Sequence, residues 1–167
     1  MRSTVVAVLL LTVIGSAFAR SYPLFKQCDS KWGSDSLGSS STICKVGCLI
    51  SSVSMALAGC SKSVAGQGAN PKSLNSWLKS HGGYSGNLFN WGSVGTLGLK
   101  YQGKISGAAN IKSAIAADKI VILNVNNGGH WVLATGSTGS DFSVNDPGYS
   151  KTSYPSSGVS LAAVFTV

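Results

Sequence analysis

Apolar residues follow two different patterns along the chain, and the first of them predicts helices. From residue 48 to 58 they show no strict alternation and stop before a glycine, which predicts a buried helix of about three turns. Residues 70–83 predict a second helix, because Asn70 and Pro71 are typical of an N-cap and a first turn and a glycine pair closes the segment. Residues 108–117 predict a third, shorter helix.

The second pattern begins after Asp118 and predicts strands. Short β-branched or aromatic runs, separated by Gly, Ser and Asn, cover residues 120–125, 131–135, 142–145 and 161–167. A mainly helical half followed by such strands predicts one α+β domain with an antiparallel sheet. The residues before the first helix, 20–47, predict loop structure, since they are rich in Ser, Gly and Asp.

Residues 84–107 show neither pattern clearly. Tyr84, Phe89, Trp91 and Tyr101 stand among glycines there, and they are expected either to line a substrate groove or to fill the core. The usual burial of aromatic side chains favours the core.

The N-terminal residues have the composition of a secretory signal peptide. An apolar block follows Met1-Arg2, and a small-x-small cleavage pattern ends at Ala19. We therefore expect residues 1–19 to be removed and residues 20–167 to form a single domain in an extracellular space or a lysosome-like lumen. No later stretch has the length and apolarity of a membrane anchor. A monomer is expected.

The chain is basic, with 13 Lys and Arg residues against 5 acidic residues and a formal net charge of +8 at pH 7. This charge favours contact with acidic surfaces such as bacterial walls, anionic glycans or lipid headgroups, although solubility alone would explain it equally well. Nucleic-acid binding is not expected, because the basic residues are scattered and no Arg follows Arg20.

Four cysteines, Cys28, Cys44, Cys48 and Cys60, enter an oxidising route and are candidates for disulfides. Two bridges would allow three connectivities. If Cys48 is instead a free nucleophile, only one bridge can form and a second free thiol remains. A zinc site is not expected, because Cys44 and Cys48 have no second pair of correctly spaced ligands, and no cofactor is implied.

Cys48 stands at the expected N-terminus of the first helix. Unpaired backbone N–H groups and the helix dipole favour a thiolate there. Gly47 permits a tight turn and the close approach of a substrate. By position alone, a half-cystine or a small buried hydrophobic residue is an equally good interpretation.

His130 begins an expected strand and is the candidate base for Cys48. If the strand that it begins and the strand that follows form a hairpin symmetric about Thr138, His130 lies opposite Asp146. The carboxylate would then orient the imidazole toward the thiol. The alternative is a histidine at a strand edge and an Asp-Pro pair that only ends a strand.

Two neighbouring aromatic groups have structural interpretations. Strand alternation places Trp131 on the face opposite His130, where core packing is expected. His81, the only other histidine, precedes a glycine pair and is expected to cap a helix C-terminus or to lie on the surface.

A thiolate that attacks a carbonyl also needs hydrogen-bond donors for the oxyanion. The backbone N–H of Cys48 can supply one, and a side-chain amide commonly supplies another. Gln27, in the loop region upstream of the nucleophile, is the candidate for this second donor.

The chain resembles papain-like cysteine peptidases of the bacteriocin-processing type, peptidase family thirty-nine, and in particular their stand-alone relatives. The matching motifs, in order, are Gln27-x-Asp29-x-x-Trp32, Gly47-Cys48 before a helix with Met55, Gly129-His130-Trp131-Val132, and Asp146-Pro147. The resemblance implies a papain-like fold in which a helical half, with the nucleophile at a helix N-terminus, packs on a C-terminal antiparallel sheet.

The same resemblance implies four roles. Cys48 would be the nucleophile, His130 the base, Asp146 the orienting acid and Gln27 the oxyanion donor. The sequence departs from the pattern at Leu49, where many relatives have Gly, and in its three other cysteines.

The expected function is therefore that of a secreted or lysosomal cysteine peptidase or amidase that hydrolyses peptide bonds through a thiol acyl-enzyme. A peptide substrate is favoured over a peptidoglycan cross-link, and acyl transfer by the same triad stays open. The alternative is a non-catalytic, disulfide-stabilised secreted module that binds acidic glycans or microbial walls, with Cys48 oxidised in one of two bridges.

Overall fold

A six-stranded antiparallel sheet organises the chain. The computed structural model describes residues 20–167, and the expected signal peptide, residues 1–19, lies outside them. The strands, in their order across the sheet, are β11 (Ser153–Pro155), β10 (Asp141–Asn145), β9 (His130–Thr138), β8 (Ile120–Val125), β12 (Val159–Thr166) and β7 (Lys100–Ile105). The predicted α+β class with an antiparallel sheet is confirmed.

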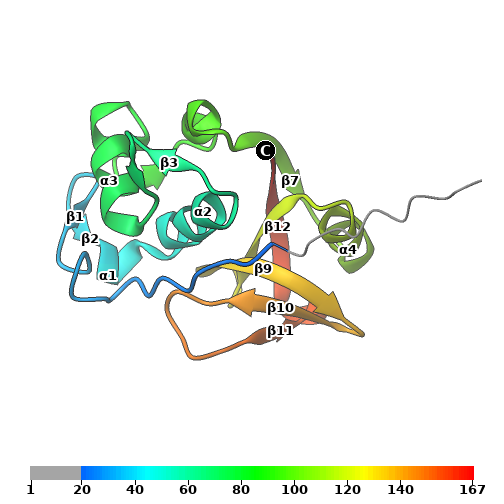
Figure 1. Ribbon diagram of the computed structural model, residues 1–167. Coiled ribbons are helices and arrows are strands. Elements are labelled where there is room, and N and C mark those ends of the chain that lie inside the picture. The colour runs from blue at the N-terminus through cyan, green and yellow to red at the C-terminus, as the bar shows by residue number, and fades with distance from the viewer. Residues whose placement is uncertain (1–19) are drawn as a thin grey trace, which may run out of the picture.

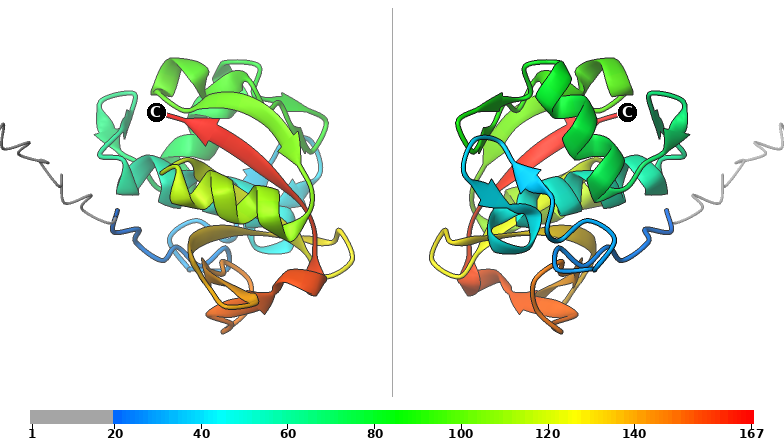
Figure 2. Two further views of the ribbon diagram at one scale, coloured as in Figure 1. Left: turned by 90° about the vertical axis from the view of Figure 1, so that its right-hand side faces the viewer. Right: turned by 90° about the vertical axis from the view of Figure 1, so that its left-hand side faces the viewer.

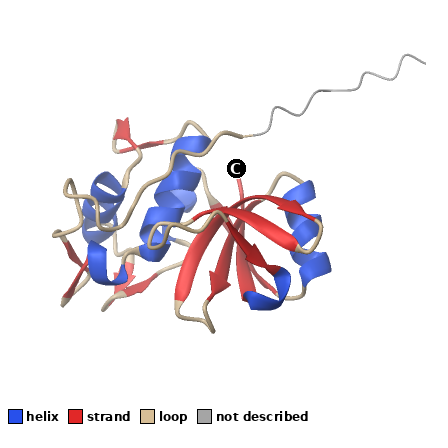
Figure 3. Ribbon diagram, turned by 90° about the horizontal axis from the view of Figure 1, so that it is seen from below, coloured by secondary structure: helices blue, strands red, loops and turns tan. Residues whose placement is uncertain are grey.

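Helices cover both faces of this sheet. They are α1 (Ile43–Val46), α2 (Cys48–Gly59), α3 (Pro71–Ser80) and α4 (Ala108–Ala116), with short 3-10 helices η1 (Ser93–Leu97) and η2 (Ser156–Gly158). Helix α2 packs against β9 and β8, and α3 packs behind α2. Helix α4 lies on the opposite face, so the sheet separates it from the other helices (Figures 1 and 3). Figure 2 shows these two sides of the molecule in turn.

Residues 120–125, which form β8, are mostly apolar and do not alternate with polar residues, because both faces of this strand are covered. Ile120 and Ile122 belong to the core on the side of α2, whereas Val121, Leu123 and Val125 belong to the core on the side of α4. Both faces of the strand are therefore buried, and a polar residue at every second position would have no water to face.

The three longer helices occupy the predicted segments. Helix α3 starts with Pro71 after a capping box, in which the Asn70 side chain accepts from the Ser73 N–H and the Ser73 side chain bonds back to the Asn70 N–H. His81 is its C-cap and is exposed, which confirms the prediction of a capping or surface residue, and its ring stacks on Trp77 with centroids 4.3 Å apart.

Short pairings between 36 and 89 were not predicted. They are the hairpins β1 (Ser36–Leu37) with β2 (Ser41–Thr42), β3 (Ser63–Val64) with β4 (Gln67–Gly68), and β5 (Tyr84–Ser85) with β6 (Leu88–Phe89). Two-residue strands carry too few side chains for a periodic pattern to appear in the sequence.

The edge strand β7 was also missed, for a different reason. Its residues alternate only between exposed and half-buried positions, and Gly103 has φ of +115° beside an irregularity in the pairing with β12. Such a bulged edge strand lacks the strong apolar face that marks a strand in sequence.

The aromatic residues of this region pack together against the core. Trp91 stacks on Tyr101 with centroids 5.4 Å apart and meets Trp131 edge-on at 5.1 Å. Phe89 is buried, while Tyr84, Trp91, Tyr101 and Trp131 are partly buried against the same cluster. The expectation of core packing for Trp131 and for the aromatic residues of 84–107 is therefore confirmed.

A disulfide joins Cys28 to Cys44, which leaves Cys48 and Cys60 as free thiols. This pairing ties the loop region that precedes α1 to α1 itself. One disulfide and two free thiols are also what the sequence predicted for the case in which Cys48 does not form a bridge. Among residues 20–167, no helix has the length and apolarity needed to cross a membrane.

Replacing both Cys28 and Cys44 by serine should lower the free energy of unfolding by about 3 kcal/mol, which is the loop-closure contribution of a bridge across roughly 15 residues. Denaturant unfolding of the non-reduced proteins measures this difference. Cys60→Ser is the control, since it removes a cysteine without breaking the bridge, and should change the value by less than about 1 kcal/mol. Titration of four thiols in the unfolded, non-reduced protein would contradict the pairing.

Candidate functional site

Cys48 is the first residue of α2, as the sequence predicted, and its side chain is half-buried. Its backbone N–H is among those that precede the first hydrogen bond inside the helix. The preceding Gly47 ends α1, and a Cβ there would collide with the backbone carbonyl and side chain of Ile43. A glycine is thus required here because the chain turns tightly against the first residue of α1. This agrees with the tight turn that the sequence predicted for Gly47, while its predicted role in the approach of a substrate stays a prediction.

Leu49, the residue that departs from the family pattern, is partly buried against the core on the side of α2. Its neighbour Val46, at the end of α1, is by contrast 44% exposed. The larger side chain at position 49 is therefore directed into packing.

His130 is the first residue of β9, where it pairs with Val125 of β8. The residue is only 6% exposed. Its Nε2 lies 2.7 Å from Oδ1 of Asp146, which is 1% exposed. The structure therefore brings together the histidine and the carboxylate that the sequence singled out.

The hairpin register that led to this pair was nevertheless wrong. Thr138 pairs with Asp141 across a two-residue turn, and the pairing shifts between Ser143 and Val144 so that Asn145 faces Leu133. The bulge and the later turn break the symmetry about Thr138 that was assumed. Asp146 follows the end of β10, and its side chain reaches His130 from a position that is not directly opposite.

The Asp146 carboxylate accepts hydrogen bonds from four groups. Oδ1 receives the His130 ring, the Gly148 N–H at 2.8 Å and the Tyr149 N–H at 2.9 Å. Oδ2 receives the Tyr154 hydroxyl at 2.7 Å. A buried carboxylate stays ionised only when such donors replace the water that it has lost.

These contacts shift the titration of both partners. Burial by itself would lower the pKa of His130, but the hydrogen bond to Asp146 and the neighbouring Cys48 thiol outweigh it and raise the pKa to about 9. Burial would raise the pKa of Asp146, but the hydrogen bonds from His130, Tyr149, Tyr154 and Gly148 outweigh it and lower the pKa to about 2. An imidazolium–carboxylate pair is therefore the stable form across neutral pH.

Gln27 lies beside this pair. Its backbone N–H donates to the Pro147 carbonyl at 2.9 Å, directly after Asp146. Its side-chain Nε2 donates to the Cys44 carbonyl at 2.6 Å, in the helix that leads to Cys48. Gln27 therefore links the loop that follows Asp146 to the segment before Cys48, and Nε2 keeps a second N–H.

Lys26 and Gly148 complete the surroundings of the pair. The Lys26 ammonium donates to the backbone carbonyls of Asp146 and Tyr149. A Cβ at Gly148 would stand 2.8 Å from Cε1 of His130 and 3.4 Å from the Gln27 side-chain oxygen. Only a residue without a side chain fits there while the ring keeps its place.

Sequence reasoning missed four residues of this site, namely Lys26, Gly148, Tyr149 and Tyr154. Asp146-Pro147-Gly148 is a recognisable turn signal, and an Asp that accepts from N–H groups two and three residues later is typical of such turns. No comparable local signal marks Tyr154, because its contact with Asp146 depends on strand pairing.

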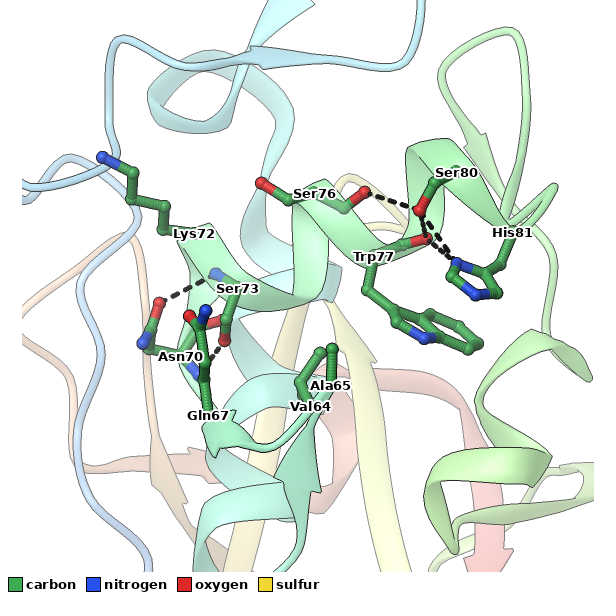
Figure 4. Close-up of a pocket in the computed structure, with 10 residues that line it drawn as sticks. All are labelled: Val64, Ala65, Gln67, Asn70, Lys72, Ser73, Ser76, Trp77, Ser80 and His81. Carbon is green, nitrogen blue, oxygen red and sulfur yellow. Dashed lines mark hydrogen bonds between the residues drawn. The ribbon is translucent and has the colours of Figure 1, made fainter.

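A separate hollow of about 370 Å³ lies between α3 and the β3–β4 hairpin (Figure 4). Most of its polar side chains are already used in helix caps, since Asn70 and Ser73 bond each other and Ser80 bonds the Ser76 and Trp77 carbonyls. It contains neither of the free cysteines. The convergence of Cys48, His130 and Asp146 therefore marks a stronger candidate site than this hollow.

No three His, Cys, Asp or Glu side chains within 20–167 form a group that could hold a metal ion. Cys44, one of the two cysteines considered for zinc, is in the disulfide. The chemistry available at the site is that of a thiol, an imidazole and a carboxylate.

A comparison with solved structures finds a protease with a similar fold. The chain is similar to a structure described as a double glycine motif protease from an AMS/PCAT transporter in complex with the leader peptide. The TM-score is 0.56 at 17% sequence identity, and the match covers 91% of this chain and 96% of that one. At this identity the likeness is one of fold, so the architecture of the chain is similar to that of the double glycine motif protease. No family model matches the sequence, and no curated protein matches it.

The stability contributed by the His130–Asp146 pair should depend on pH in a defined window. The raised pKa of His130 means that its contribution is complete below 6.5 and is lost as the pH rises through about 9. The lowered pKa of Asp146 means that its contribution is present above 3.8 and is lost as the pH falls through about 2. The difference in unfolding free energy between wild type and Asp146→Asn should therefore be largest from about pH 4 to 6.5. Denaturant unfolding at several pH values measures it, and a pH-independent difference would contradict the ion pair.

Gly148→Ala should push the His130 ring away from Asp146 and return the pKa of His130 toward its ordinary value of 6.5. The unfolding free energy should fall as well, because the variant loses the stability that the raised pKa of His130 represents. An NMR titration of the imidazole measures the effect. Gly92→Ala is the matched control, because its Cβ would meet no atom within 4 Å and its φ is −78°. An unchanged titration in Gly148→Ala would refute the steric argument.

Proposed function

We propose that the chain is a cysteine peptidase or amidase that hydrolyses peptide bonds through a thiol acyl-enzyme. The single observation that carries this proposal is the buried 2.7 Å contact between His130 and Asp146 beside the free Cys48 thiol. The similarity to a double glycine motif protease bound to a peptide supports it, because the same fold accommodates a peptide there.

The tautomer of His130 follows from its partner. Since Nε2 donates to the Asp146 carboxylate, Nδ1 is the nitrogen left to receive the proton of the Cys48 thiol. Proton transfer from sulfur to Nδ1 gives a thiolate and an imidazolium, and Asp146 stabilises the charge on the ring. The raised pKa of His130 favours this ion pair.

The chemical steps use the same groups in turn. The Cys48 thiolate adds to the substrate carbonyl carbon, and the electron pair of the C=O bond moves to oxygen. The Cys48 N–H and the second N–H of Gln27 Nε2 are assigned to this oxyanion. The oxyanion then collapses, the C–N bond breaks, and the His130 imidazolium protonates the leaving amine. Water, deprotonated by His130, finally hydrolyses the thioester and restores the thiol.

Charge suggests the character of the substrate and its surroundings. Between residues 36 and 117 the chain has lysines but no Asp or Glu. A peptide with acidic groups, or a peptide held in an acidic matrix such as a microbial wall, would be attracted to this half. The Cys28–Cys44 disulfide is compatible with an oxidising compartment, so we favour an extracellular or lysosome-like location.

The non-catalytic alternative required Cys48 to be oxidised in one of two bridges. The single disulfide leaves Cys48 free, so that pairing is not formed. A basic surface that attracts acidic polymers remains part of the proposal as a means of bringing the enzyme to its substrate.

Cys48→Ala and His130→Ala should each lower turnover by about three orders of magnitude or more, because the nucleophile and its base act as one unit. Asp146→Asn should lower it less, since this residue orients the base without reacting. New amino termini, released from a panel of unfolded proteins and from peptidoglycan fragments, measure the activity and distinguish the two substrate classes by mass spectrometry.

Cys60→Ser is the matched control for these variants, because it removes the other free thiol and should keep wild-type turnover. Alkylation of Cys48 by iodoacetamide should abolish turnover in the wild type and in this control. Full activity in Cys48→Ala, or no cleavage of either substrate class by the wild type, would overturn the proposal.

A further inference from the structure

The Asp146 carboxylate accepts a hydrogen bond from a second side chain, which is not one of the proposed triad. Tyr154 is 3% exposed, and its hydroxyl donates to Oδ2 of Asp146 at 2.7 Å. The other carboxylate oxygen, Oδ1, faces His130. Each oxygen of the carboxylate thus has its own side-chain partner, on opposite sides.

Three adjacent strands place these groups in a line. The sheet order is β11, β10, β9, and Tyr154, Asp146 and His130 come from β11, from the residue after β10 and from β9. Tyr154 pairs with the buried Phe142 of β10, so its ring is held by the sheet and by the core on the side of α4. The position of the hydroxyl is therefore set by rigid elements, whereas Asp146 itself stands in a turn.

We propose that Tyr154 is a positioning residue of the triad, whose hydroxyl holds the Asp146 carboxylate in the orientation that presents Oδ1 to His130. The Gly148 and Tyr149 N–H groups hold Oδ1 from within the turn, but they leave Oδ2 without a partner, and the terminal torsion of a carboxylate is a soft one. A donor fixed on Oδ2 removes that freedom and stabilises the negative charge. This inference rests on the proposed function of Cys48 and His130.

The other charged groups around Asp146 do not replace this contact. Lys26 donates to the backbone carbonyl of Asp146 and not to its carboxylate. The Lys151 ammonium lies over the Tyr154 ring, 4.8 Å from its centroid, and thus contacts the tyrosine and not the carboxylate. Burial and the hydrogen bond to Asp146 raise the pKa of Tyr154, and the Asn126 side chain partly opposes this shift. The phenol therefore keeps its proton, and stays a hydrogen-bond donor, throughout the neutral pH range.

The test compares Tyr154→Phe with Tyr84→Phe. Each substitution keeps the aromatic ring and removes one hydroxyl, but the Tyr84 hydroxyl donates to the Asn75 amide, 2.9 Å away, and not to the triad. We expect Tyr154→Phe to lower kcat by about tenfold and to leave KM within about twofold of the wild-type value, because positioning of the base acts on the chemical step. Tyr84→Phe should change neither.

A second readout needs no substrate. The rate of Cys48 alkylation by iodoacetamide, followed by peptide mass spectrometry to separate Cys48 from Cys60, reports the thiolate that His130 supports. Loss of the Tyr154 hydroxyl removes a donor from the ionised Asp146, so the acid midpoint of this rate should move up by about one pH unit. A residue that only filled space would leave the pH profile unchanged.

A double-mutant cycle shows whether Tyr154 acts through Asp146. In an Asp146→Ala background, Tyr154→Phe should have no further effect on the alkylation rate, whereas two independent effects would multiply. Asn126→Gly is a second variant that keeps the ring, the hydroxyl and the left-handed backbone at position 126, where φ is 53°. Because the Asn126 side chain lowers the pKa of Tyr154, its loss should make the phenol a weaker donor to Asp146. The pH profile of Cys48 alkylation should then shift in the same direction by a smaller amount, which keeps the inference testable if Tyr154→Phe folds poorly.

The outcomes separate this inference from the proposed function. If His130→Ala slows the alkylation of Cys48 but Tyr154→Phe and Asn126→Gly match the wild type in rate and pH profile, the role of Tyr154 is refuted while the triad stands. Multiplicative effects in the cycle would also refute it. If His130→Ala leaves Cys48 alkylation unchanged, the triad itself fails and the inference fails with it.

Discussion

A single buried carboxylate is the constraint on which the site depends. Asp146 is almost inaccessible to water, and an isolated charge in that position would be strongly unfavourable. Four donors, from His130, Gly148, Tyr149 and Tyr154, compensate for the lost hydration. Because these donors come from two strands and a turn, the carboxylate can be satisfied only when the sheet is correctly paired. Correct pairing of the sheet is thus a condition for assembling the site.

The proposed nucleophile, Cys48, comes from the other layer of the molecule. Cys48 begins α2, which packs against β9, the strand that His130 begins. The relative position of sulfur and imidazole is therefore set by helix–sheet packing and not by any local turn. This arrangement keeps the reacting groups on rigid elements, which suits a chemistry that tolerates little misplacement.

The chain before α1 joins the two layers. Gln27 bonds the loop after Asp146 through its backbone and the Cys44 carbonyl through its side chain, while the neighbouring Cys28 is bridged to Cys44. Trp32 and Leu37 anchor this segment in the core on the side of α2, and the disulfide adds a covalent constraint to that packing. The two cysteines outside this bridge, Cys48 and Cys60, are partly buried.

Some helices, strands and contacts could be predicted from the sequence, and others could not. The helices over 48–58, 70–83 and 108–117 and the four predicted strands were found because each buries a continuous apolar face or begins with a clear cap. The edge strand β7 and the two-residue hairpins have neither, and they could not be found in this way. The pairing of His130 with Asp146 was predicted correctly from a register that was wrong, since the bulge in the β9–β10 hairpin leaves no trace in the pattern.

The sequence by itself determined the α+β class, the order of helices and strands, and the candidate thiol, imidazole and carboxylate, because periodicity, caps and rare reactive residues are local properties. Only the tertiary structure decided which cysteines pair and that Tyr154 bonds the far oxygen of Asp146. Those are contacts between residues brought together by strand order and layer packing, and the distance between two side chains in space is not encoded in their spacing along the chain.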